Sequence, residues 1–299
     1  MDSTSNDPGT FPEEPHLSWW NVAVASGFLL INGAISVYMG LGLEKTILIA
    51  AVRCIIQLTI MGYVLTEIFS SKQPVIIMAL ATLLVLLATF ELTFHRAKHR
   101  FTGSFLTIFG SLYLSTLLMS IIGKGSLALE TRPFYDPIVF IPTLGMLIGN
   151  GMSAIGVGLS YSLNQLLEHS ELIEQRLAFG ATRWEASRPV AIEAIKLALL
   201  PTINSMSVIG LITIPGMMTG QILGGTPIMD AVKYQQIIMF LITASSSLGT
   251  VISVLVCAIM LIRTRVASER GEGGKGSGGG SGGTGICHYP FIVKQQHFQ

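Results

Sequence analysis

Charged residues are scarce in this chain. They make up 12% of its 299 residues, whereas hydrophobic residues make up 50%. Soluble domains carry about 25% charged residues, and the mean hydropathy here is +0.63. The deficit excludes an ordinary water-soluble protein of this length and predicts a membrane protein. The formal net charge of +1 says nothing about partners, and we expect no nucleic acid among them.

Nucleotide-binding and metal-binding motifs are also missing from the sequence. It contains no G-x-x-x-x-G-K-[ST] phosphate loop, no H-E-x-x-H and no Cys-x-x-Cys. His95 and His99 have a helical metal-ligand spacing, but they lie in the basic run HRAKHR, where cation repulsion opposes a metal. We therefore expect no catalytic residue, no metal site, no cofactor and no nucleotide site in this chain.

Cysteine is rare as well. Cys54 and Cys257 fall in apolar runs and Cys287 falls near the end of the chain, so no disulfide framework is expected.

Long apolar runs dominate what remains. A membrane-spanning helix needs about 20 mostly apolar residues, and the sequence holds seven such runs. We therefore predict an all-α polytopic membrane protein with about seven transmembrane helices. The runs are 19–40, 46–68, 74–92, 104–122, 137–163, 199–223 and 236–262.

The distribution of Lys and Arg predicts how the runs are oriented. With seven spans, alternate loops share a side, and one side collects most of the basic residues, including Arg96, Arg100, Arg176 and Arg183. The basic side is cytosolic. The N-terminus is then non-cytosolic and the C-terminus cytosolic; which membrane holds the protein does not follow.

The two ends of the chain differ in composition from the rest. Residues 1–18 are acidic and lack Lys and Arg, so they are no secretory signal. We expect an extracytosolic leader over 1–18, a permease domain over 19–265, and a flexible Gly/Ser-rich tail over 266–299.

A charged amphipathic segment, which we place at 164–198, interrupts the apolar runs. Gly180 is expected to end one helix, and Thr182 is expected to cap the next through the backbone of Trp184 or Glu185. Trp184 is a candidate anchor for a soluble partner. The remaining candidates for contact with a partner are Glu174 and Ala181.

Taken together, these residues resemble a known family. The matching stretches are Arg53–Leu58, Arg96–His99, Gly149–Met152, Leu177–Thr182, Pro215–Gly220 and Gly224–Gly225. Over about residues 20–265 the chain resembles the small ABC-transporter permeases that include FetB-type iron exporters and plant aluminium-tolerance permeases (UPF0014-like). The acidic leader and the tail depart from that pattern.

The resemblance implies function as well as fold. It implies a separate cytosolic ATPase subunit that binds the ATP, docked through Glu174, Gly180, Ala181, Thr182 and Trp184. It also implies a homodimer of permeases in the lipid bilayer and export of a metal ion or a metal-linked solute.

Polar groups inside the apolar runs are candidates for the substrate path. Arg53 and Gln57 share one face of the second run and either line a cavity or, for Arg53, reach the headgroups. Asn150 lies in a glycine-rich part of the fifth run. That part is either a packed helix with an interhelical hydrogen bond or a broken helix lining a path.

The end of the sixth run, Ile214–Pro227, is the candidate gate. Pro215 is expected to kink the helix, and Gly216, Gly220 and Gly224 to soften it. Four further path candidates follow Gly216, and the two methionines among them either bind a soft metal or fill space. They are Met217, Met218, Thr219 and Gln221.

Two other functions remain as alternatives. A self-contained secondary transporter should show inverted repeats, and the sequence shows none that is convincing. A seven-span receptor fits the number of spans, but a retinal-type sensor needs a Lys in the middle of the last span, and Lys233 lies at its edge.

Overall fold

The computed structural model describes residues 18–71, 73–96, 103–125 and 137–273. Regular structure in these segments is helical, with one isolated bridge between Ile209 and Thr213. Seven of the described helices are long and apolar enough to cross a membrane, which confirms the predicted fold class. The helices are α1 (Trp19–Tyr38), α2 (Glu44–Ser71), α3 (Pro74–Glu91), α4 (Ser104–Gly125), α5 (Pro137–Glu168), α6 (Ser170–Ala178), α7 (Arg183–Val208), α8 (Gly216–Leu223) and α9 (Ile228–Gly273).

The sixth predicted span is wrong in its boundaries. The apolar run 199–223 is not one helix, because α7 begins at Arg183 and ends at Val208, and α8 is separate. Hydropathy measures the affinity of side chains for lipid and does not report backbone hydrogen bonds. A helix break inside an apolar run therefore does not change the hydropathy of that run. The predicted tail overlaps the end of α9, and residues 274–299 and 1–17 lie outside the described part of the chain.

The chain forms two compact units, residues 1–73 and 74–299. In the first unit, α1 and α2 form a helical hairpin. The hydroxyl of the buried Ser36 accepts a hydrogen bond from the Leu43 backbone at 2.9 Å and donates one to the Glu44 carboxylate at 3.2 Å. Gly40 and Gly42, both with positive φ, let the chain reverse over these few residues.

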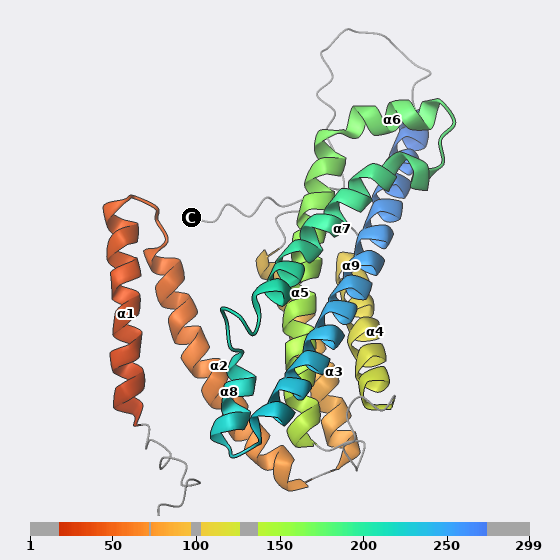
Figure 1. Ribbon diagram of the computed structural model, residues 1–299. Helices are drawn as coiled ribbons and strands as arrows, with labels where there is room; N and C mark the ends of the chain where they lie inside the picture. Colours follow the sequence, from red (N-terminus) through yellow and green to blue (C-terminus); the bar gives the residue numbers. More distant parts are fainter. Residues whose placement is uncertain (1–17, 72, 97–102, 126–136, 274–299) are drawn as a thin grey trace, which may run out of the picture. The chain divides into compact units, whose positions relative to one another are not determined.

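The second unit is a helical bundle built around α5 and α9. These two helices pack against each other, α7 packs on both, and α3 and α4 complete the bundle (Figure 1). Ile108, Leu112, Leu144 and Ile155 are among its most buried apolar side chains. The short helix α6 crosses one end of α5, α7 and α9, and α8 lies beside α9 toward the other end (Figure 1).

Helix α7 packs on the bundle through very small side chains. Its buried residues are Ala186, Ser187, Ala191, Ala194 and Ala198. Facing them, Gly158 of α5 has so little room that an added β-carbon would lie 3.0 Å from Thr250 Cγ2 on α9. Small residues on both sides therefore allow α5, α7 and α9 to approach closely.

Candidate functional site

The turn between α6 and α7 forms a tightly closed elbow at the end of the bundle, over residues 178–185. Gly180 has φ of +89°, a left-handed backbone conformation that favours glycine. Its N–H donates to the Leu177 carbonyl at 3.0 Å, and the Ala181 N–H donates to the Arg176 carbonyl at 3.1 Å. These two bonds are the Schellman pattern that ends a helix, so Gly180 interrupts the helix as predicted.

The reason Gly180 is needed is its backbone angle and not lack of space. A steric explanation would require neighbours crowding a side chain at this position. A β-carbon added to Gly180 would meet nothing within 4 Å. The turn therefore has room for a side chain, and substitution of Gly180 acts through conformational strain.

Thr182 begins α7 as its N-cap, as predicted. The Glu185 N–H donates to Thr182 Oγ1 at 3.3 Å, and the Thr182 N–H donates to the Glu185 carboxylate at 2.8 Å. This reciprocal capping box satisfies two backbone donors that a helix start leaves open, and losing such a cap costs about 1 kcal/mol. The Arg176 guanidinium also donates to the Ala186 carbonyl at 3.4 Å, which ties α6 to α7.

Three large apolar side chains of α6 and the elbow are exposed. Phe179 is 85% exposed, Leu172 47% and Trp184 42%. Ile173, the residue of α6 directly after Leu172, is buried and belongs to the core of the bundle. Phe179 was not among the predicted site residues; its place directly before the helix-ending glycine was the available signal.

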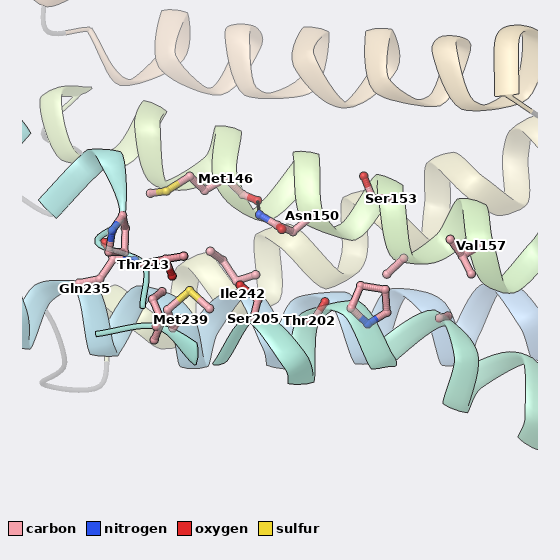
Figure 2. Close-up of a pocket in the computed structure, with 15 residues that line it drawn as sticks. Met146, Asn150, Ser153, Val157, Thr202, Ser205, Thr213, Gln235, Met239 and Ile242 are labelled. Atoms are coloured by element: carbon pink, nitrogen blue, oxygen red, sulfur yellow. Dashed lines mark hydrogen bonds between the residues drawn. The ribbon is translucent and has the colours of Figure 1, made fainter. Parts of the chain in front are cut away.

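A pocket of about 400 Å³, lined by nine apolar and six polar residues, lies between α5, α7 and α9. Figure 2 shows Met146, Asn150, Ser153 and Val157 on one wall and the α7 and α9 residues on the other. The full set comes from these helices and the loop after α7: Met146, Asn150, Ser153, Ala154, Val157, Ala198, Pro201, Thr202, Ser205, Ile209, Thr213, Pro215, Gln235, Met239 and Ile242.

Amides, hydroxyls and thioethers supply the polar atoms of the pocket, and none of its fifteen described lining residues is charged. Gln235 is 7% exposed, and its side-chain oxygen is buried without a hydrogen-bond partner. The Asn150 amide nitrogen donates to the Met146 carbonyl at 2.9 Å within α5. That bond uses only the nitrogen, so the Asn150 side-chain oxygen keeps its acceptor capacity.

The fifth run is a continuous helix, so the broken-helix interpretation placed there is wrong. Asn150 hydrogen-bonds within α5, and its nitrogen makes no interhelical bond to the residues that the structure describes. Gly149 shows no close approach, since an added β-carbon would meet nothing within 4 Å. The close contacts of α5 fall at Gly151, Gly156 and Gly158 instead.

The broken helix lies after α7. The chain leaves the helix at Val208, passes through Gly210 with φ of +84°, and re-enters a helix at Gly216. Within a membrane, non-helical backbone is tolerated where it is buried in protein or lines a water-filled cavity. Thr213 and Pro215 of this loop line the pocket. Pro215 is thus the N-cap of α8 and does not kink a longer helix.

The other predicted gate and path residues of this region belong to α8. Gly216 opens that helix, Gly220 lies inside it, and Gly224 is its C-cap. Met217, Met218, Thr219 and Gln221 lie on α8 and do not belong to the pocket lining. Gln221 still has a buried side-chain oxygen without a partner.

Arg53 and Gln57 lie one helical turn apart on α2 in the first unit, and both are exposed. All pocket residues belong to the second unit. Sequence reasoning found Asn150 and Pro215 but missed most of the pocket, including Ser205, Gln235 and Met239. Gln235 carried a signal, because it is an uncharged amide at the start of an apolar run.

Comparison with known proteins agrees with this architecture. The model of an uncharacterised protein family, UPF0014, matches residues 19–262. The chain is 33% identical to the UPF0014 membrane protein slr1647 of Synechocystis, covering 79% of this chain and 90% of that protein. It is 33% identical to the probable iron export permease protein FetB of Escherichia coli, covering 78% and 88%. No solved structure matches the chain.

Plant proteins are related as well. The chain is 28% identical to the protein ALUMINUM SENSITIVE 3 of Arabidopsis thaliana, covering 79% of this chain and 84% of that protein. Seven membrane-spanning helices and relatives of this kind define an integral multi-pass transport permease. The chain belongs to the UPF0014 family.

Proposed function

We propose that this chain is the membrane subunit of an ABC-type exporter, driven by ATP hydrolysis on a separate cytosolic subunit. The substrate would be a metal ion or a metal-linked solute, as the name of the Escherichia coli relative suggests. The permease would act as a homodimer, with the elbow in the cytosol and the N-terminus on the other side. The pocket between α5, α7 and α9 would lie on the transport path.

The elbow is the observation that carries this proposal. A helix that ends at Gly180 and restarts at the capped Thr182 presents Phe179 and Trp184 at a fixed place on the surface. Exposed aromatic side chains on a rigid turn are typical anchors of protein–protein interfaces. The positive-inside distribution of Lys and Arg would put this surface in the cytosol, where an ATPase is available.

The pocket supports a transport role for the same helices. Asn150, Ser153 and Ser205 are exposed polar side chains on spanning helices. Lipid offers such groups no hydrogen-bond partners. Exposed polar side chains on these helices therefore favour contact with a water-filled cavity or with a second copy of the chain. Helix α7 connects the two places, because it begins at the elbow and lines the pocket from Ala198 to Ser205.

The test is site-specific crosslinking at the elbow in native membranes. A photo-reactive amino acid at Phe179 is expected to capture one soluble protein that mass spectrometry identifies as an ABC ATPase. The same residue at Leu118, an exposed position on α4, serves as the control and should not capture it. The purified pair should hydrolyse ATP, and Phe179→Ala should reduce co-purification at least tenfold. Transport without any ATPase would instead favour a secondary transporter.

A further inference from the structure

The pocket between α5, α7 and α9 has a volume of about 400 Å³, and none of its fifteen described lining residues is charged. We propose that it binds an uncharged, oxygen-rich organic molecule, either free or wrapped around a metal ion, and does not bind a bare or hydrated metal ion. This inference rests on the proposed function, since it names the substrate class of the proposed transport path.

Charge is the first argument. Ions such as Fe²⁺ and Al³⁺ are held by anionic or strongly donating ligands, because desolvating a multivalent cation is otherwise too costly. The polar groups of the fifteen lining residues are neutral amides, hydroxyls and thioethers, and the other lining residues are aliphatic. Within the described residues, no group of three or more His, Cys, Asp or Glu could hold a metal ion. A cation bound here without its own ligands would have its charge uncompensated by the lining.

Size is the second argument. Sites for organic ligands have volumes of roughly 300–1,000 Å³, and this pocket has about 400 Å³. A dehydrated metal ion held by side chains needs donors converging on a far smaller space. Here the possible donors are spread over three helices and a loop, with Asn150 and Gln235 on different helices (Figure 2).

The side-chain oxygen of Gln235 is an unsatisfied acceptor that a ligand could hydrogen-bond. A buried polar atom without a hydrogen bond destabilises the protein, and among the described residues Gln235 Oε1 in the pocket wall has no hydrogen-bond partner. A ligand hydroxyl or amide, or a water that it holds, would satisfy it. Ser153, Thr202 and Ser205 add hydroxyls, which both donate and accept. A neutral ligand whose surface is rich in oxygen atoms fits these donors and acceptors.

Direct binding to the full-length chain in lipid nanodiscs tests the proposal without any ATPase. Radiolabelled iron is offered either as hydrated Fe²⁺ or as the uncharged iron(III) complex of three maltolates, and maltol is also offered with a carbon label. We expect saturable retention of the complex, of maltol alone, or of both. The two labels show whether the metal accompanies the organic molecule.

The variants use two neighbouring glutamines. Gln235→Leu should weaken binding about tenfold, the consequence of one lost buried hydrogen bond. Gln236→Leu is the matched control, because Gln236 is exposed and outside the pocket lining. Gln235→Glu should weaken retention of the neutral probe and increase retention of Fe²⁺.

Three results would overturn the proposal. They are Gln235-dependent retention of hydrated Fe²⁺ by the wild type, retention of no organic probe, and equal retention by wild type and Gln235→Leu. Each is separable from failure of the proposed function, which is decided by crosslinking at the elbow and by ATP hydrolysis.

Discussion

Gly158 of α5 and Ala198 of α7 lie so close that a β-carbon added to Gly158 would be 3.3 Å from the Ala198 β-carbon. The same added atom would lie 3.2 Å from Val254 on α9. Three spanning helices thus meet at one position that has room for a hydrogen atom and for little else. Ala198 also lines the pocket, so this contact borders the proposed path.

Substitution of Gly158 should therefore destabilise the bundle. Overpacking a close contact costs about 1–3 kcal/mol or more, so Gly158→Leu should lower the thermal unfolding temperature in detergent by several degrees. Gly149→Leu is the matched control on the same helix, since an added β-carbon there meets nothing within 4 Å. Equal shifts for both variants would contradict the close three-helix contact.

Substitution at Gly180 should impair the elbow through backbone strain. An L-residue in the left-handed region costs about 1–2 kcal/mol, and Gly180 has φ of +89°. Gly180→Ala should lower ATPase co-purification and coupled hydrolysis while insertion stays normal. Gly180→Asn should be milder, because Asn tolerates this region better than Ala. If Ala and Asn behave alike, the strain argument fails.

Thiol labelling at position 179 tests whether the elbow faces the cytosol. In a chain whose Cys54, Cys257 and Cys287 are replaced by Ser, Phe179→Cys should react with an impermeant thiol reagent only after permeabilisation. Ser3→Cys should react from the outside. The opposite pattern would remove the elbow from the cytosol. Ser187 would be a poor reporter, because it is fully buried.

Methionine pairs test whether thioethers bind a metal. Met217 and Met218 lie on α8, outside the pocket lining, whereas Met146 and Met239 line it. Leucine is close to methionine in volume, so such exchanges cost less than about 1.5 kcal/mol. Both double Met→Leu variants should keep substrate-stimulated ATP hydrolysis within about threefold of wild type. A large loss in the Met146/Met239 pair alone would assign those thioethers to a soft-metal site.

Much of the fold could be predicted from the sequence. Hydrophobic runs are long where helices cross lipid, so the spans before α7 were found. The elbow was also predictable, because Gly180 and Thr182 act through local backbone chemistry that depends on few neighbours. Helix-ending glycines and helix-capping residues can therefore be recognised without knowledge of the tertiary structure.

The pocket was not predictable in the same way. It joins Asn150, Ser205 and Gln235, which are far apart in the sequence and meet only because α5, α7 and α9 pack side by side. The start of α7 after the capping Thr182 was predicted, but its continuation as one helix from the charged first turns into the sixth apolar run was not. Its end was missed because the residues after Val208 stay apolar while the helix stops.

The alanine face of α7 has a mechanical consequence. Burial of apolar surface stabilises a contact in proportion to its area, and a methyl group buries far less than a leucine side chain. Four alanines and a serine form the buried face of α7. A shift of α7 along its neighbours would therefore not require large interlocked side chains to separate. Helix α7 joins the elbow to the pocket, and Pro189 and Pro201 inside it each remove one backbone hydrogen-bond donor from the helix. A movement at Thr182 would therefore reach Ser205 through a helix that can bend at two places.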